Sequence, residues 1–313
     1  METMARTIIL MKRKPTVSIG IPAYNEEANI NKLFKSIIMQ KKGDYFLKKI
    51  IIVLDACTDK TEEKVKELHD KRIRIIKNKN RIGQALSQNK ILNESDTDIL
   101  VLLNSDILLD KRFIVELIKP FKKSKKMGIV SARAKAIPAK TFFERIINYS
   151  FEFKVSLFKN FNNSDNHYLC YGRARALSKD FIKKIKWPKI FSEDIYSYLK
   201  AKQLGFNFYY NSSAIFYYKS PDTFTDHIKQ SVRFQKSIKE LNQYFPISLI
   251  RRNYIIPKPL LAKYGLKFLI KNPILFLGYL LIFVITNTVG IIDKKNPVLW
   301  RPSISSKTIT NYE

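Results

Sequence analysis

The chain has 313 residues, which is enough for one large α/β domain or two smaller ones, each with its own core. Hydrophobic residues make up 45% and charged residues 27%, so the composition excludes a disordered protein. The two cysteines, Cys57 and Cys170, exclude a disulfide framework and fit a reducing compartment. The net charge of +30 permits binding to nucleic acid, attachment to an anionic membrane face, or a coding bias toward Lys, Ile and Asn.

Strand and helix patterns alternate over the first 120 residues. Runs of β-branched and apolar residues predict strands at residues 16–21, 49–54, 72–76 and 99–103. Helical spacing or polar turns between them predict helices at residues 26–38, 61–70 and 84–94. Asn25 is expected to cap the first helix. This alternation predicts a parallel, doubly wound sheet, in which ligands bind at the carboxyl ends of the strands.

Polar residues follow the strand at 99–103 directly. Asn104 and Asp106 are two residues apart, so their side chains point the same way in an extended chain. Two oxygen ligands at a strand end suit Mg²⁺ or Mn²⁺ bridging a diphosphate. An Asx-type turn is the simpler interpretation of this triplet when it is taken alone.

Four segments, each at a strand end, resemble the successive nucleotide-sugar motifs of family 2 glycosyltransferases. They are residues 19–27 (IGIPAYNEE), 54–61 (LDACTDKT), 81–89 (RIGQALSQN) and 103–106 (LNSD). An acceptor-side strand, a Glu-Asp pair and a Gln-x-x-Arg-Phe variant of the Gln-x-x-Arg-Trp synthase motif extend the resemblance. They are residues 171–178, 193–194 and 230–234. The resemblance implies an α/β protein of the GT-A fold, with a mostly parallel, doubly wound sheet and a catalytic domain over residues 1–245.

The resemblance also implies a nucleotide-diphosphate sugar donor, with UDP favoured, and Mg²⁺ or Mn²⁺ as cofactor. Asp55 would accept from the uracil N3–H, and Ala23 and Tyr24 would lie near the base or ribose. The residues expected to bind the nucleotide sugar are Pro22, Ala23, Tyr24, Glu26, Asp55, Arg81, Gln84, Asn104, Ser105, Gln230, Arg233 and Phe234. Asp106, with Asn104, is expected to hold the metal. Gly172 and Arg173 are expected to contact the acceptor.

Asp194 is the implied catalytic base of an inverting transfer, and Glu193 is expected to orient a neighbour. At the start of a helix the ionised carboxylate of Asp194 would be stabilised, which suits a group that accepts a proton. Without the resemblance, both acids would be interpreted as helix caps. Asn104 stands where the family usually has Asp, and Gln84 where it often has Lys. Phe234 replaces Trp and therefore lacks the indole N–H.

Residues 246–313 are the expected membrane-associated region. Residues 272–292 carry no charge and are long enough for a membrane helix. Residues 249–271 mix basic and apolar side chains, as an interfacial helix does, and their charge predicts a cytoplasmic catalytic domain. The aromatic stretch at 142–161 is either ordinary core or an amphipathic element at the bilayer surface. Residues 300–307 are similar to a C-terminal signature of membrane-attached family members. A single crossing and a re-entrant or surface-lying hairpin are both open.

The sequence therefore predicts inverting sugar transfer to a polysaccharide or a lipid-linked saccharide at the cytoplasmic face of the cell membrane. One membrane segment is too little to line a channel unaided. This favours a lipid-linked acceptor, a short product or a membrane partner protein. The alternatives are a polyprenyl-phosphate glycosyltransferase and a non-catalytic basic protein of the same fold that binds membrane or nucleic acid. No nucleic-acid partner is expected.

Overall fold

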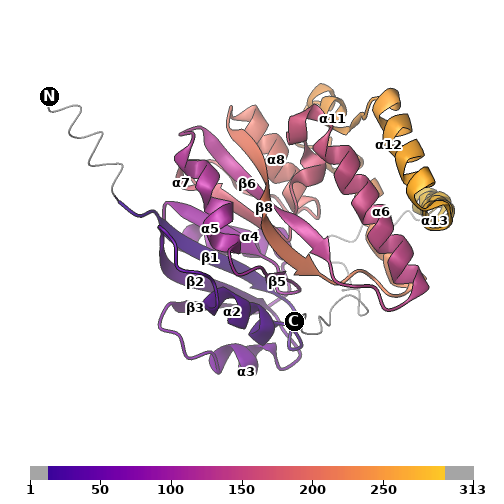
Figure 1. Cartoon of the computed structure of the whole chain (residues 1–313). Coiled ribbons are helices and arrows are strands. Elements are labelled where there is room, and N and C mark those ends of the chain that lie inside the picture. Colours follow the sequence, from indigo (N-terminus) through magenta and orange to yellow (C-terminus); the bar gives the residue numbers. More distant parts are fainter. Residues whose placement is uncertain (1–12, 293–313) are drawn as a thin grey trace, which may run out of the picture.

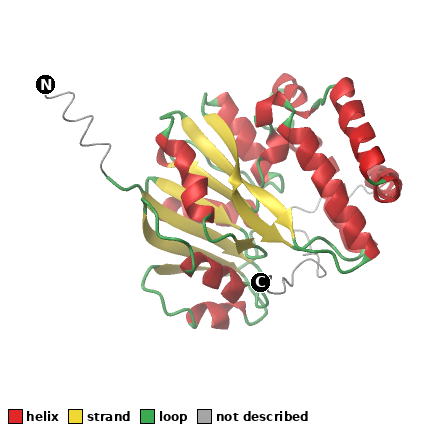
Figure 2. Ribbon diagram, viewed as in Figure 1, coloured by secondary structure: helices red, strands yellow, loops and turns green. Residues whose placement is uncertain are grey.

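The computed structural model describes residues 13–292, apart from the side chains of residues 233, 291 and 292. A curled β-sheet forms the centre and helices cover both of its faces (Figure 1, Figure 2). Helices α6 (Phe142–Lys159), α12 (Lys258–Lys271) and α13 (Pro273–Ile292) gather at one end of the molecule. The signature expected at residues 300–307 lies outside the described residues.

The sheet has eight strands in the order β3-β2-β1-β4-β7-β6-β8-β5. They are β1 (Thr16–Ala23), β2 (Phe46–Asp55), β3 (Ile73–Asn78), β4 (Ile99–Leu103), β5 (Leu108–Leu109), β6 (Met127–Ala136), β7 (Ala174–Ser178) and β8 (Asn207–Tyr218). Strand β1 pairs in parallel with β2 and β4, and β2 in parallel with β3. Strand β7 is antiparallel to both β4 and β6, which makes the sheet mixed. The α/β class with a mostly parallel sheet is confirmed.

Helices and short 3₁₀ turns connect these strands. They are α2 (Ile30–Ile38), α3 (Thr61–Lys66), α4 (Gln84–Glu94), α5 (Phe113–Ile118), η1 (Lys119–Lys122), η2 (Asn162–Ser164), η3 (His167–Leu169), α7 (Lys179–Ile182), α8 (Glu193–Gln203), α9 (Phe224–Gln235), α10 (Ser237–Leu241) and α11 (Ile247–Tyr254). Strand β4 and helix α4 have the predicted bounds. Because β1, β2, β3 and β4 run parallel, their carboxyl ends lie at a common edge of the sheet.

Two predicted helix boundaries are wrong, and local hydrogen bonds explain why. Asn25 does not cap α2: its φ is +53°, and its side chain exchanges hydrogen bonds with Thr58 at 2.9 and 2.8 Å. Helix α2 therefore begins only at Ile30. Helix α3 ends before residue 70, because the Asp70 carboxylate accepts from the Arg72 backbone N–H in the turn that leads to β3.

Strand β1 continues through Pro22, where the prediction ended it. Its pairing with β4 stops at Gly20, so the missing N–H of Pro22 leaves no gap in that ladder. Helix α7 ends at Ile182, and Ile185 and Trp187 then turn into the core, where they are 5% and 1% exposed. Because β1 extends to Ala23, its last residues line the predicted donor site.

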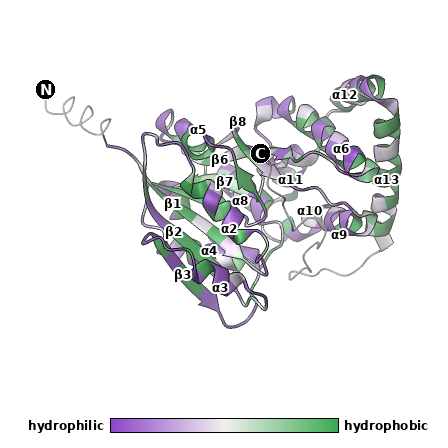
Figure 3. Cartoon of the chain, turned by 60° about the horizontal axis from the view of Figure 1, so that its bottom comes forward, coloured by the Kyte–Doolittle hydropathy of each residue, from purple (hydrophilic) through white to green (hydrophobic). Residues whose placement is uncertain are grey.

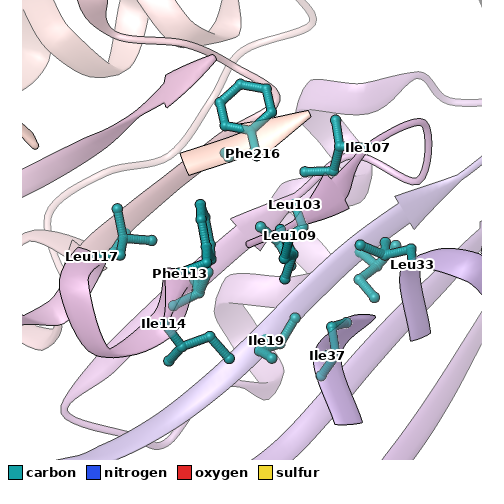
Figure 4. Packing of buried hydrophobic residues seen from close by; sticks show 14 of the residues in the cluster. Ile19, Leu33, Ile37, Leu103, Ile107, Leu109, Phe113, Ile114, Leu117 and Phe216 are labelled. Atoms are coloured by element: carbon teal, nitrogen blue, oxygen red, sulfur yellow. The ribbon is translucent and has the colours of Figure 1, made fainter. Parts of the chain in front are cut away.

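The sheet is held between two hydrophobic clusters. On one face, Leu33 and Ile37 of α2 and Phe113 of α5 pack against Ile19 and Leu103 of the strands (Figure 4). On the other face, residues of α4, α7 and α8 form the second cluster. Each of the five named side chains is at most 2% exposed, and its burial contributes roughly 1.5–3 kcal/mol. The strands are therefore fixed, and so are the loops at their ends.

A third cluster joins α6 to the C-terminal helices. It consists of Ile146, Ile147, Tyr149, Phe153 and Leu157 of α6, Phe268 of α12, and Phe276, Tyr279 and Ile282 of α13. The buried side of the aromatic stretch is thus ordinary core, as the first of its two interpretations predicts. Within the described chain, one helix is long and apolar enough to cross a membrane, over Pro273–Gly290, and 22% of that window is buried. Helix α13 is largely hydrophobic and lies at the edge of the molecule (Figure 3).

Candidate active site

A cavity of about 590 Å³ extends from the carboxyl ends of β1, β2 and β4 to helices α6, α9 and α13. Predicted site residues from distant parts of the chain line this one cavity. They are Pro22, Ala23, Tyr24, Glu26, Asp55, Arg81, Gln84, Asn104, Ser105, Asp106, Gly172, Arg173, Glu193, Asp194, Gln230 and Phe234. The side chain of Arg233, the remaining predicted residue, lies outside the described part of the structure.

Asp55 organises the loop that leads into α4. Its carboxylate is buried and accepts from Asn78 Nδ2 at 2.8 Å and from the backbone N–H groups of Ile82 and Gly83 at 2.9 and 2.8 Å. Gly83 has a φ of +91°, a conformation that glycine adopts without steric cost. A nucleotide base would therefore meet a carboxylate that already accepts three hydrogen bonds, with little accepting capacity left.

Tyr24 and Arg81 form a stacked pair in the same wall of the cavity. The Arg81 guanidinium carbon lies 3.8 Å from the centre of the Tyr24 ring. This contact joins the loop after β1 to the loop before α4. It offers an aromatic face and a fixed cation side by side, which suits a base and a phosphate.

Gln84 connects the end of β4 to the start of α8. Its amide donates to Asn104 Oδ1 at 3.1 Å and to Glu193 Oε1 at 2.8 Å. The Asn104 backbone N–H donates to the Arg173 carbonyl at 2.9 Å. A neutral amide at position 84 thus bridges a neutral amide and a buried carboxylate. The Asn104 amide oxygen is already an acceptor in this bridge.

Asp106 lies beside a cation. Arg173 Nε is 3.9 Å from Asp106 Oδ2, and the Arg173 guanidinium carbon is 4.6 Å from the centre of the Tyr218 ring. Residue 173, predicted to contact the acceptor, thus lies next to the predicted metal ligand. Among the described residues, no group of three His, Cys, Asp or Glu side chains is placed to hold a metal. One carboxylate fits Mg²⁺ or Mn²⁺ when substrate phosphates and water supply the other ligands.

Asp194 and Glu193 occupy the first turn of α8. Asp194 Oδ1 accepts from the Ile195 backbone N–H at 2.8 Å, and Oδ2 accepts from the Gly172 N–H at 3.3 Å. A Cβ at Gly172 would lie 2.8 Å from Glu193 Oε1, so glycine permits the close approach of β7's entry to α8. The positive end of the helix stabilises an ionised carboxylate at this point. Asp194 therefore occupies a position that suits both an acidic residue at a helix start and a general base.

Glu240 positions the start of α8, and the sequence patterns gave no indication of this. Its carboxylate accepts from the backbone N–H groups of Phe191 and Ser192 at 3.0 and 3.1 Å. These two residues immediately precede the Glu-Asp pair, so the α10 side chain fixes the chain where the pair begins. These hydrogen bonds join residues 49 and 48 positions apart, and the periodicity of a sequence does not reveal such long-range contacts.

Cys170 and His167 also line the cavity, and both are uncharged at neutral pH. Burial raises the pKa of the Cys170 thiol to about 12, so it is not a thiolate. Burial lowers the pKa of His167 to about 3, although its hydrogen bond with the Asn253 carbonyl, at 3.0 Å, opposes this shift. Neither group is suited to accept a proton from an acceptor hydroxyl.

The mixed sheet with helices on both faces is a GT-A fold. The family model for glycosyl transferase family 2 matches residues 18–186, which is more than half of the chain. The chain therefore belongs to this family.

Two curated relatives show how far the similarity extends. The probable glycosyltransferase YdaM of Bacillus subtilis is 26% identical over 258 residues, covering 76% of this chain and 60% of the relative. The dolichol-phosphate mannosyltransferase of Pyrococcus furiosus is 29% identical over 120 residues, covering 38% of this chain and 34% of the relative. The chain thus spans between about one third and three fifths of the length of these two relatives.

Two solved structures share the fold at low sequence identity. The mannosyltransferase PcManGT from Pyrobaculum calidifontis, in complex with GDP-Man and Mn²⁺, has a TM-score of 0.60 at 15% identity, covering 91% of this chain and 77% of that one. S. aureus TarS 1–349 in complex with UDP has a TM-score of 0.52 at 18% identity, covering 74% and 68%. This likeness shows the GT-A fold that the sequence motifs predict.

Proposed function

We propose that this protein transfers a sugar from a nucleotide-diphosphate sugar, preferably UDP-linked, to a hydroxyl group of a saccharide. The observation that carries the proposal is that Asp106, Asp194 and the Tyr24–Arg81 pair line one cavity at the strand ends. Ligands bind at this edge in open α/β sheets. The structural neighbours that were solved with GDP-Man and with UDP support a nucleotide donor.

Asp194 acts as the general base in the proposed reaction. Its carboxylate takes the proton of the acceptor hydroxyl, and the hydroxyl oxygen attacks the anomeric carbon of the sugar. The bond from that carbon to the diphosphate oxygen breaks, and its electron pair leaves with the diphosphate. Because attack and departure occur on opposite faces, the anomeric configuration inverts. Glu193 accepts a hydrogen bond from Gln84 at 2.8 Å and so holds that side chain against the start of α8.

Asp106 and Arg173 serve the departing diphosphate. Arg173 offers a planar cation next to Asp106, which suits phosphate oxygens. Asp106, with Asn104 nearby, would hold a Mg²⁺ or Mn²⁺ ion shared with the diphosphate, and such an ion supplies charge neutralisation at the leaving group. Arg81 provides a second cation, held over the ring of Tyr24 in the cavity wall.

Helices α12 and α13 hold the protein to the cytoplasmic face of the membrane. The outward apolar residues of α13 are Ile274, Leu277, Leu280, Leu281, Phe283, Val284 and Ile285. The other side of α13 follows the catalytic domain: the space at Gly278 is filled by Ile146 of α6, and Gln235 of α9 donates to the Thr286 carbonyl at 3.2 Å. A crossing helix would carry the charged residues of α6 and α9 into the bilayer, which is costly. This supports a surface-lying helix over a single crossing.

The test is transfer by membranes that contain the protein. A panel of radiolabelled UDP- and GDP-sugars is supplied with Mn²⁺ or Mg²⁺, and both nucleotide release and labelled product are scored. One donor is expected to give acceptor-dependent nucleotide release. Absence of release and product across the panel, in membranes where the protein is folded, would favour the non-catalytic basic protein.

A further inference from the structure

The cavity continues past the predicted catalytic residues into an arm between α6, α9 and α13. Aromatic contacts trace this path. Arg173, beside Asp106, lies over the ring of Tyr218, and Tyr218 packs against Phe151 of α6 at 5.2 Å between ring centres. Lys154 lies three residues further along α6, hence on the same side of the helix. The arm is therefore continuous with the site of sugar transfer.

Lys154 brings a positive charge into this arm, and no carboxylate of the described residues lies close enough to affect its pKa. Its Nζ lies 5.2 Å from the centre of the Tyr279 ring on α13. Burial alone lowers the pKa of Lys154 to about 8, so the side chain is still protonated at neutral pH. The Lys154 side chain is partly exposed, and an ammonium group that is partly removed from water is stabilised when an anion pairs with it.

His227 of α9 faces the same arm and does not supply that anion. Burial and the charge of Lys154 lower the pKa of His227 to about 4, so its ring is neutral. The ring nitrogen Nε2 lies 3.2 Å from the hydroxyl of Ser231. Among the described side chains that line the arm, Lys154 is therefore the charged one, while Gln230 and Ser231 of α9 are neutral polar groups that can bond to a ligand.

Two aromatic side chains stand at the open end of the arm. Phe234 of α9 and Phe283 of α13 line the cavity while remaining 56% and 48% exposed. Phe283 also belongs to the outward apolar side of α13, and its ring packs on Tyr279 at 5.9 Å. A ligand that occupies the arm thus meets a cation inside and a continuous apolar surface on leaving it.

We propose that Lys154 binds the phosphate that links the acceptor saccharide to a lipid, with the saccharide directed toward Asp194 and the lipid chain leaving over Phe234 and Phe283. This inference rests on the proposed function and specifies its acceptor. The ligand chemistry is a phosphate monoester or diester joined to a long apolar chain. Since the phosphate is the binding group and a sugar hydroxyl is the nucleophile, the role of Asp194 as base is retained.

Binding of farnesyl phosphate to the full-length protein in detergent, measured by calorimetry without any donor, tests the inference. Lys154→Met keeps the length of the side chain and removes its charge, so we expect about 10- to 100-fold weaker binding. Lys154→Arg is expected to stay within about threefold of the wild type. Lys159→Met, an exposed position at the end of the same helix, is the matched control and is expected to bind as the wild type does.

Farnesol and inorganic phosphate, used as separate probes, distinguish the sources of affinity. We expect both to bind much more weakly than farnesyl phosphate. Equal binding of farnesyl phosphate by Lys154→Met and wild type would overturn the inference, as would equal affinity for farnesol. Inorganic phosphate binding as tightly as farnesyl phosphate would identify a free-anion site and would also overturn it.

UDP binding by the same preparations separates this inference from the proposed function. UDP affinity unchanged in Lys154→Met confirms that the variant is folded and that the arm is separate from the donor end. If no preparation binds UDP or any nucleotide sugar while the Lys154 dependence persists, the proposed donor chemistry fails and the lipid-phosphate site stands.

Discussion

The two ends of the cavity are built in different ways. At the donor end, polar side chains are bonded to one another and to the backbone, as Asp55 and Gln84 are. In the arm, aromatic rings stand beside neutral polar side chains such as Gln230 and Ser231, and Lys154 pairs with no carboxylate of the described chain. At the donor end, these polar groups find their hydrogen-bond partners within the protein. In the arm, the charge of Lys154 finds none among the described carboxylates, so a bound anion would neutralise it.

The largest expected effect is at the proposed base, between the two ends. Asp194→Asn keeps the shape of the side chain but removes its basicity, so kcat should fall by about 10²- to 10⁴-fold. The measurement is labelled product per unit time at saturating donor. Asp180→Asn, at an exposed position on α7, is the control. A polyprenyl-phosphate acceptor is already ionised and needs no base, so an unchanged kcat would favour that alternative.

Asp106→Ala should break the donor end next. Loss of the carboxylate proposed to hold the metal with the diphosphate should lower kcat/KM by about 100-fold and raise the Mn²⁺ concentration required. A Mn²⁺ titration of initial rates gives both numbers. Asp96→Ala removes an exposed acid outside the cavity and should change neither. An identical Mn²⁺ dependence in Asp106→Ala would contradict the assignment.

The proposed contact of α13 with the membrane can be tested by replacing exposed apolar residues of this helix with polar ones. Leu277, Leu281 and Val284 are 56%, 64% and 60% exposed, so replacing all three by Ser should leave the core intact. Removing this apolar surface should lower cosedimentation with anionic lipid vesicles by tenfold or more, as roughly 25 cal/mol per Å² implies. Met39→Ser with Phe46→Ser, which are equally exposed elsewhere, is the control. Full membrane binding by the α13 variant would count against a surface-lying helix.

Gln84→Leu should weaken the bonded network without removing any charge. It leaves the buried Glu193 carboxylate and the Asn104 amide without their shared donor. We expect about a tenfold loss in kcat/KM and about 1–2 kcal/mol of unfolding free energy. Urea unfolding and steady-state kinetics provide the two values. Gln203→Leu, on the exposed end of α8, should be neutral, and equal behaviour of the two variants would show that the bridge is dispensable.

The smallest effect is the pH dependence that His167 brings to stability. Its folded pKa of about 3 is below the ordinary 6.5, so the unfolded chain binds a proton that the folded chain does not. This contribution is fully present above pH 6.5 and is lost as pH falls toward 3. Between pH 7 and 6 the free energy of unfolding should fall by about 0.7 kcal/mol, measured by urea unfolding. His167→Phe, which keeps a ring against Tyr254, should show a shallower slope; an equal slope would contradict this origin.

Much of the fold was predictable because its strands are short apolar runs bounded by polar turns. Residues 99–103 and 84–94 form the expected strand and helix. The start of α2 was not predictable, because the Asn25 side chain bonds Thr58, thirty-three positions away, instead of capping locally. Long-range hydrogen bonds of this kind leave no periodic signal in the sequence.

Some site residues were likewise predictable from the sequence and others were not. The donor-end residues follow strand ends, and parallel strands bring such ends together, so the sequence motifs indicated them. Lys154 was hidden, because a lysine on an amphipathic helix is usually solvated and nothing in its spacing reveals that α9 and α13 enclose it. The resemblance suggested that Arg173 contacts the acceptor, but only the packing of β7 against β4 shows how close it lies to Asp106.

The most direct test of this two-ended cavity is a pair of Michaelis constants measured on two variants. Arg81→Met should raise the donor KM by about tenfold and leave the acceptor KM unchanged, because it removes a charge at the donor end. Lys154→Met should do the reverse with a lipid-linked acceptor. This crossed pattern is the predicted result. If both variants change the same KM, the cavity is not divided into a donor end and an acceptor arm.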